Sequence, residues 1–304
     1  GGVTANFSVT AGPQAFVFPA STLVQNQWNQ YTVTISNTSL LLYKNGDMGV
    51  QILVSTLLFL LYPEKFSNKW KLSFAILVLL DFLIFSAYSR SGMVSFLIGI
   101  FCFIVLNKDA QLKSRSLQFI KFIPWILLIV VPIYINIQVD ENFQGRAIGL
   151  DQIVNNFSSI LGGTTDATSE NNVIWRLVWW AKILNYSFTF PNFIIGKGLG
   201  LNLTISDNIA TLDNTLRAPH NFHLNIMARF GVLIFIVWIY WLILLLRPLF
   251  KKLLTGRKLA LGCILFAFII NASFDVFLEG PMGAFPFWTF VGLFLLEKEN
   301  SVVP

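Results

Sequence analysis

The sequence predicts an all-α polytopic membrane protein with about seven transmembrane helices, a large external loop domain and a short N-terminal β segment. Three observations predict this fold class: the composition, a series of apolar runs, and the distribution of the basic residues. Of the 304 residues, 55% are hydrophobic and 12% are charged, and the mean hydropathy is +0.67. Because soluble domains carry about 25% charged residues, this chain has too little polar surface to fold in water.

Apolar runs begin at residue 50 and continue to residue 296. A helix needs about 20 apolar residues to cross a bilayer, so the runs at 72–88, 222–246 and 259–278 predict spans most clearly. The shorter runs could also be interfacial or re-entrant segments. All the runs together lie at 50–62, 72–88, 93–106, 122–137, 222–246, 259–278 and 283–296.

Basic residues gather in the loops that alternating spans would place on one side of the membrane. Loops 63–71, 107–121 and 247–258, with Lys298 behind the last span, hold thirteen of the 21 Lys and Arg residues. Because positive charge collects on the side that is not translocated, this side is predicted to be cytoplasmic. The predicted parts are an extracytoplasmic β-rich segment (1–48), transmembrane helices 1–4 (49–137), an external loop (138–221), helices 5–7 (222–296) and a cytoplasmic tail (297–304).

The N-terminal segment differs from the rest of the chain in its pattern. Residues 31–36 alternate polar and apolar side chains, which is the period of a half-buried strand, and residues 40–44 form a second candidate strand. Asn45-Gly46 is a favoured hairpin turn because both residues tolerate positive φ. The first residue is Gly1 rather than Met, so a fragment or a processed chain is expected.

The external loop at 138–221 has about 80 residues, far more than an ordinary connection. Its middle, 162–172, is rich in Gly, Thr and Asn, whereas residues 173–184 form an amphipathic stretch with several tryptophans. Such a stretch is typical of a helix that lies at the membrane interface. We therefore expect a partly folded external domain that rests on the membrane and carries the catalytic residues.

Two arginines lie where an anionic substrate would meet the outer face. Arg90 stands between Ser89 and Ser91 at the outer end of a span, and Arg176 follows Trp175 in the amphipathic stretch. Guanidinium groups bind phosphates bidentately, so both side chains are candidate ligands of an anion. The alternative for each is an interfacial anchor whose long side chain reaches the lipid headgroups.

Glycines recur at positions 196, 198 and 200, after the amphipathic stretch. The pattern follows no strand of a dinucleotide-binding fold and is predicted to lie outside the membrane. It favours either a tight turn or the close approach of backbone N–H groups to a phosphate. Gly198 and Gly200 are therefore candidate substrate-binding residues.

A histidine directly precedes one of the long spans, in the stretch Arg217-Ala-Pro-His220-Asn221. Pro219 is predicted to start the helix, with His220 and Asn221 in its first turn, where unpaired N–H groups attract anions. A histidine at an aqueous rim suits general-base catalysis. Two alternatives stay open: a structural histidine, or a metal pair with His223, for which no third ligand is visible.

A few charged residues fall inside the apolar runs or at their ends. These residues are Asp81, Arg229, Asp275 and Glu279. Because a charge is costly in lipid, they are expected to face the interior of the bundle or a cavity. They form no series of intramembrane carboxylates, and no inverted repeat is visible, so a proton-coupled transporter is disfavoured.

The order of these motifs resembles that of the O-antigen ligase and polymerase superfamily over residues 70–296. The features that carry the resemblance are Ser89-Arg-Ser-Gly92, Arg176, Trp179, Gly196-x-Gly-x-Gly200, Pro219-His-Asn-x-x-Leu224 and Phe230-Gly-Val-Leu-Ile234. Residues 25–48 also resemble a fragment of laminin-G or concanavalin-like jelly rolls. Two features depart from the family pattern: His223 stands where an aromatic residue is usual, and the predicted spans are fewer.

The resemblance implies a GT-C-like glycosyltransferase of the bacterial inner membrane with its active site facing the periplasm. Its donor would be an undecaprenyl-diphosphate-linked glycan, its acceptor another glycan or a lipid core, and its surroundings membrane lipids. The transfer would invert the anomeric centre, with no metal, cofactor or nucleic acid involved. By this resemblance His220 is the catalytic base, Arg90 and Arg176 hold the diphosphate, and Arg217 and Asn221 assist.

The residues leave three functional classes open. Within the transferase class, ligase and chain polymerase share the donor chemistry and differ only in the acceptor. The second class is a transporter or flippase of lipid-linked glycan. The third is a membrane-anchored β-domain that binds carbohydrate, although a simple anchor would not need seven spans or outer arginines at three positions.

Overall fold

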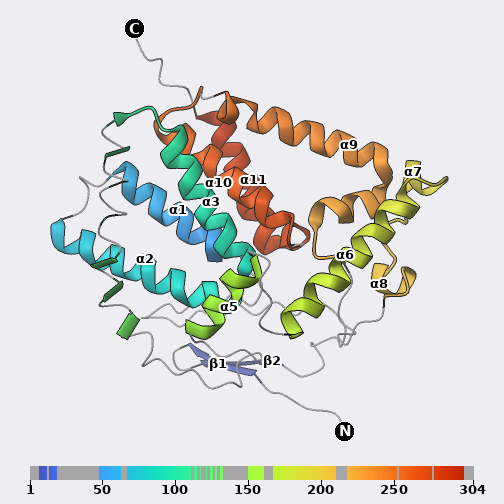
Figure 1. The fold of residues 1–304 in the computed structure, drawn as a ribbon, viewed down its shortest axis with the longest axis horizontal. Helices are drawn as coiled ribbons and strands as arrows, with labels where there is room; N and C mark the ends of the chain where they lie inside the picture. The colour runs from blue at the N-terminus through green and yellow to red at the C-terminus, as the bar shows by residue number, and fades with distance from the viewer. Residues whose placement is uncertain are drawn as a thin grey trace.

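The computed structural model describes most of the chain outside the N-terminal segment and parts of the predicted external loop. The described residues are 7–11, 14–18, 48–62, 67–110, parts of 113–132, 150–160, 167–209, 218–251, 253–275 and 277–297. They are mostly helical, which confirms the predicted all-α class at that level (Figure 1). The predicted strands at 31–36 and 40–44 and the turn at Asn45-Gly46 lie outside the described residues.

Two strands are described near the N-terminus. β1 (Phe7–Ala11) pairs antiparallel with β2 (Gln14–Phe18), with Phe7 opposite Phe18. The longer helices are α1 (Met48–Leu61), α2 (Asn68–Tyr88), α3 (Arg90–Leu106), α9 (Phe222–Phe250), α10 (Gly256–Ala272) and α11 (Pro281–Leu296). The remaining helices are α5 (Leu150–Ile160), α6 (Ala167–Ser187), α7 (Asn192–Ile195), α8 (Leu203–Ser206) and the short 3₁₀ helix η3 (Phe277–Glu279).

The main core lies between α1, α3, α10 and α11. Leu53, Phe103, Cys263 and Phe287 are all buried in it. Small residues allow α1 and α3 to approach closely, because a Cβ at Gly49 would lie 2.3 Å from the backbone oxygen of Gly92. Small residues at contacts between helices are typical of membrane bundles, where backbone proximity replaces the hydrophobic effect as a driving force.

Many apolar side chains point away from this core. α9 is the one helix among the described residues that is long and apolar enough to cross a membrane, and only 28% of its most apolar window is buried. Shorter apolar helices cover Gly49–Leu61, Arg90–Leu106 and Gly283–Leu296. Large exposed apolar surfaces mark contact with a partner or a membrane. The count of seven spans stays a prediction.

The two ends of the helix bundle differ in what surrounds them. Figure 1 shows the first turns of α3 and α11 and the last turn of α10 at one end, on the side of α6. The last turn of α11 and the connection between α9 and α10 lie at the opposite end. The connection between α9 and α10, which is predicted to be cytoplasmic, therefore lies at the end of the bundle opposite to the first turn of α3, where Arg90 lies.

A kink at Gly231 divides α9 into two helical parts. Gly231 has φ 84° and ψ 173°, a conformation essentially restricted to glycine. The chain just after α7 fills the break, since the N–H groups of Lys197 and Gly198 donate to the carbonyls of Ala228 at 2.8 Å and Arg229 at 2.9 Å. The kink therefore has a specific cause: a loop inserts into the hydrogen-bond ladder of the helix.

Replacing Gly231 by alanine is expected to lower the thermal stability of the protein clearly. The new Cβ would lie 2.8 Å from the backbone of Ile194 and Phe193, and the backbone conformation alone costs about 1–3 kcal/mol for a side chain. The matched control is Gly292→Ala on α11, where nothing lies within 4 Å. Thermal unfolding in detergent tests this, and equal melting temperatures for the two variants would contradict it.

Candidate functional site

His220 lies in the turn that leads into α9. The prediction that Pro219 starts the helix, with His220 and Asn221 in its first turn, is wrong by three residues, because α9 begins at Phe222. Asn221 is the N-cap, and its side-chain oxygen accepts from the N–H of Leu224 at 3.0 Å. His220 has φ 50°, which is uncommon for a residue other than glycine and clusters at functional sites.

An acidic residue from the end of α10 faces the imidazole. The Nδ1 atom of His220 lies 3.5 Å from Oδ1 of Asp275, and the two side chains are 30% and 43% exposed. The N–H of Phe222 donates to the carbonyl of Asp275 at 3.2 Å, which ties the two segments together. A carboxylate on one ring nitrogen fixes the orientation of the imidazole and stabilises its protonated form.

Helix α6 places an indole and a guanidinium beside this pair. The ring of Trp175 meets His220 edge to face, with centroids 5.9 Å apart, and the guanidinium carbon of Arg176 lies 5.5 Å from the same indole. Trp180 donates its Nε1–H to the carbonyl of Pro219 at 2.7 Å. The structure thus places Arg176 and His220, two of the residues predicted to be catalytic, next to the same indole ring, that of Trp175.

Arg90 is the first residue of α3 and is half-buried. Ser89 caps the helix, since its hydroxyl accepts from the N–H of Gly92 at 3.0 Å. Figure 1 places this end of α3 at the same end of the bundle as the end of α10. The prediction that Arg90, Arg176 and His220 converge on one bound anion stays a prediction. Arg217 lies outside the described residues.

The glycine loop packs against the kink of α9. A Cβ at Gly196 would lie 2.4 Å from the backbone carbon of Arg229, so this position requires glycine for close approach. The N–H of Gly198, predicted to meet a phosphate, donates to the carbonyl of Arg229 instead. A Cβ at Gly200 would meet nothing within 4 Å. A phosphate-binding role for Gly198 or Gly200 therefore stays a prediction, because the N–H of Gly198 is already used within the fold.

Arg229 holds the same loop from inside. Its side chain is buried, as expected, and donates to the carbonyls of Leu199 and Leu201, each at 3.1 Å. Its Nε–H donates to Asn225, whose amide donates in turn to Glu279. This chain links the glycine loop to η3 beside Asp275. Asp81 on α2 is exposed, by contrast, and does not face the interior of the bundle; Glu279 is also exposed in part.

Glu279→Gln is expected to flatten the pH dependence of stability. The pKa of Glu279 is raised from 4.5 to about 7, mainly because the surrounding protein desolvates the carboxyl group; the charge of Arg229 lowers this pKa and that of Asp275 raises it, and the residue is still partly exposed. The folded state therefore holds this proton at a pH where the unfolded chain has lost it. The free energy of unfolding falls as the pH rises from about 4.5 to 7.

Thermal unfolding at pH values of about 5 and 8 measures this effect. The wild-type protein should lose stability at the higher pH, and Glu279→Gln should lose less. Glu297, which is half-buried and pairs with Arg257 at 3.7 Å, provides the matched control in Glu297→Gln. An unchanged pH dependence in Glu279→Gln would refute the assignment.

His223 is a structural histidine in this fold. The indole N–H of Trp238 donates to its Nδ1 at 3.0 Å, so Nε2 carries the proton and faces the carbonyl of Ile269 at 3.2 Å. Both ring nitrogens of His223 are therefore engaged in hydrogen bonds within the fold, with Trp238 and Ile269 and not with Asp275. This geometry removes the alternative of a metal pair formed by His220 and His223.

A buried aspartate joins α6 to the segment that follows α7. Asp207 accepts from the indole N–H of Trp179 at 2.6 Å and forms an ion pair with Lys197. Tyr186 also donates to it at 3.4 Å, and burial, followed by the charge of Asp207, raises the pKa of Tyr186. Sequence reasoning missed this cluster. It fixes the face of α6 that carries Trp175 and Arg176.

One comparison with known proteins gives a match. A family model described as O-Antigen ligase matches residues 72–239, which is more than half of the chain. The matched region contains Arg90, Arg176 and His220 and ends before Asp275. No curated protein and no solved structure matches the chain.

Proposed function

The chain belongs to the O-antigen ligase family, and from this premise we propose that it is a glycosyltransferase acting on lipid-linked glycan. The donor is an undecaprenyl-diphosphate-linked glycan, and the acceptor is a second glycan or a lipid core. The reaction takes place on the periplasmic face of a bacterial inner membrane. The observation that carries the proposal is the His220–Asp275 pair beside Trp175 and Arg176.

The transfer needs one proton acceptor and a site for a diphosphate. The acceptor hydroxyl attacks the anomeric carbon of the donor sugar while His220 takes its proton. The bond from that carbon to the diphosphate oxygen breaks, and the electron pair leaves with the diphosphate. Attack from the face opposite the leaving group inverts the anomeric centre. The products are the new glycosidic bond, the lipid diphosphate and a protonated imidazole, which Asp275 stabilises.

The leaving diphosphate gains charge in the transition state. Guanidinium groups bind such oxygens bidentately and offset this charge. Arg176 has the best support for this role because it shares the indole of Trp175 with His220. Arg90 and Arg217 are assigned to the same anion, with Gly198 and Gly200 near it. Asn221 acts mainly by capping α9, so that its side chain fixes the turn that presents His220.

The proposed function is tested with purified protein in lipid vesicles that contain the donor. The expected result is a new glycosidic bond on an acceptor supplied from outside. Movement of the donor across the bilayer without a new bond would instead identify a transporter. In cells that lack the protein, a ligase predicts unmodified core acceptor, whereas a polymerase predicts short chains that are not extended.

A further inference from the structure

The segment around α7, residues 188–201, carries large apolar side chains that the rest of the protein leaves uncovered. We call this segment the α7 loop. Ile195 and Leu199 are 64% and 69% exposed, and Phe190 is 83% exposed. An apolar surface of this kind marks contact with a partner or a membrane. The exposed large apolar residues of the α7 loop are Phe188, Phe190, Ile194, Ile195, Leu199 and Leu201.

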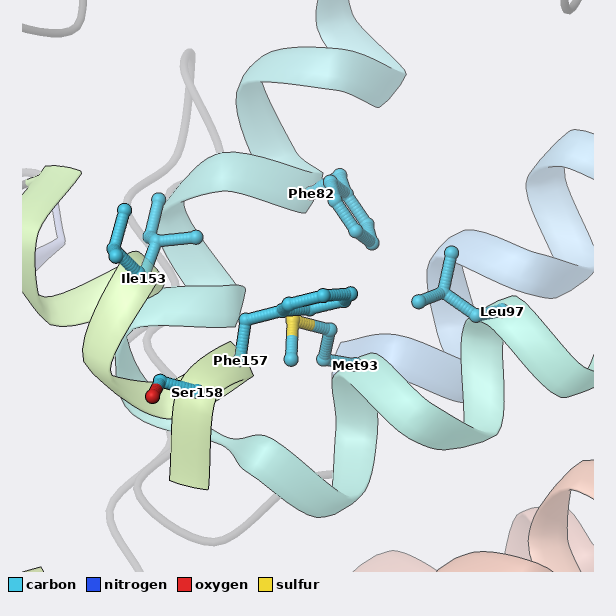
Figure 2. A pocket seen from close by; sticks show the side chains of 7 residues that line it. Phe82, Met93, Leu97, Ile153, Phe157 and Ser158 are labelled. Atoms are coloured by element: carbon cyan, nitrogen blue, oxygen red, sulfur yellow. The ribbon is translucent and has the colours of Figure 1, made fainter. Parts of the chain in front are cut away.

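This exposure needs an explanation because most of the α7 loop is not helical. Exposed apolar side chains on long helices are ordinary in a bundle that faces lipid, and those around the hollow between α2, α3 and α5 in Figure 2 are an example. A connecting loop that faces water is normally polar. Only Asn192–Ile195 form a helix in the α7 loop, and its other residues form turns and bends.

The one charged residue of the α7 loop, Lys197, points inward. It forms an ion pair with Asp207, whose side chain is fully buried, and the lysine side chain is only 17% exposed. Its ammonium group also lies 4.0 Å from the centroid of the Tyr186 ring. A buried charge is costly unless it is paired, and here the pairing leaves the outer surface of the loop apolar.

The backbone of the α7 loop finds hydrogen-bond partners within the protein. The buried guanidinium of Arg229 donates to the carbonyls of Gly198, Leu199 and Leu201. The N–H groups of Lys197 and Gly198 donate to carbonyls of α9. Non-helical backbone at membrane depth needs such partners, because hydrocarbon offers none. The α7 loop therefore meets two requirements of contact with lipid: a neutralised charge and paired backbone groups.

The contact with α9 indicates the depth of the α7 loop. Figure 1 shows α7 beside the kink of α9. The part of α9 beyond Gly231 runs to Phe250, so its 19 residues are about 28 Å long, close to the thickness of the hydrocarbon core. Lys251 follows at the predicted cytoplasmic end, which places the kink near the outer boundary of the hydrocarbon. Phe230 and Leu233, on either side of the kink, are also exposed.

We propose that the α7 loop inserts its apolar side chains into the outer leaflet, at the boundary between headgroups and acyl chains. Its partner is the acyl-chain region of ordinary phospholipid. This surface lies beyond the amphipathic stretch 173–184, for which the sequence predicted membrane contact. Because Asp207 joins the loop to Trp179 on α6, insertion holds α6 at a fixed height over the bilayer. The proposal does not depend on the transferase reaction.

Spin labels on single introduced cysteines test the insertion in phospholipid vesicles. Their collisions with oxygen, which concentrates in hydrocarbon, are compared with their collisions with a nickel chelate that stays in water. Labels at positions 195 and 199 should collide severalfold more often with oxygen, as should a label at position 237, an exposed valine of α9. A label at position 113, an exposed lysine in a predicted cytoplasmic loop, should show the reverse. The protein without an added cysteine gives the background signal.

Chelate collisions at positions 195 and 199 that are as frequent as at position 113 would overturn the proposal, because the loop would then lie in water. Low collision rates with both reagents would overturn it too, because they would identify a protein partner or a second copy of this chain on the loop. Either result leaves the transferase assay unaffected, so the two proposals fail separately.

Leu199→Glu tests the same surface with a variant, and Leu199→Met is the matched control at that position. Because a carboxylate is costly in hydrocarbon, the glutamate should move a label at position 195 toward water. The ratio of oxygen to chelate collisions at position 195 should fall severalfold in Leu199→Glu and stay unchanged in Leu199→Met. Equal ratios in the two variants would contradict the insertion.

Discussion

His220→Ala is expected to lower the kcat of glycan transfer by about two to four orders of magnitude, the usual contribution of a general base. The alanine cannot accept the proton of the acceptor hydroxyl, and no other imidazole replaces it, because both nitrogens of His223 are used within the fold. The amount of glycosylated acceptor formed per unit time by the purified protein measures this effect.

The matched control is His223→Phe, which removes the second histidine and keeps an aromatic ring. The lost hydrogen bonds should lower stability by about 1 kcal/mol each, while transfer continues. Full activity in His220→Ala, or a loss in His223→Phe as large as that in His220→Ala, would contradict the assigned base.

Arg176→Gln is expected to reduce kcat by about 10²–10³-fold, as the loss of one preorganised donor to a developing anion does. The guanidinium lies 5.5 Å from the indole that also contacts His220, so it is close to the proposed base. Arg176→Lys should recover only part of the activity, because an ammonium group cannot bind two phosphate oxygens in a planar fork.

Arg257→Gln controls for a general loss of positive charge. Arg257 lies at the opposite end of the bundle, is 63% exposed and pairs with Glu297, an interaction that contributes little. Its variant should transfer glycan at the wild-type rate. If Arg176→Gln and Arg257→Gln behave alike, the diphosphate is not held at Arg176.

The helical class followed from the sequence because an apolar run gives a strong local signal. The family match over 72–239 confirms the resemblance to the O-antigen ligase and polymerase superfamily that the motif order predicted. The start of α9 was misplaced because proline can begin a helix, which made Pro219 the predicted first residue. In the structure the side chain of Asn221 caps the helix, which begins at Phe222. Proline favours the first position of a helix and asparagine favours the N-cap before it, so Pro219 and Asn221 predict different starts, and local sequence does not decide between them.

The partners of the site residues depend on contacts between distant segments. Asp275 is separated from His220 by more than fifty residues, and its charge within an apolar run was the one sequence signal that pointed to it. Asp207 gave no signal because an aspartate in a loop is ordinary. The glycine pattern was recognised in the sequence. The reason for glycine at position 196 is the nearby backbone of Arg229, and only the fold brings the two segments together.

Release of free lipid diphosphate from the donor is the most direct test of the central claim. Purified protein incubated with lipid-diphosphate glycan and acceptor should release one lipid diphosphate for each glycosidic bond formed, and His220→Ala should release almost none. The claim has one physical basis: a base and a cation beside Trp175 act on opposite sides of one anomeric carbon, the base on the attacking hydroxyl and the cation on the leaving diphosphate. Bond formation without lipid diphosphate, or undiminished release by His220→Ala, would contradict it.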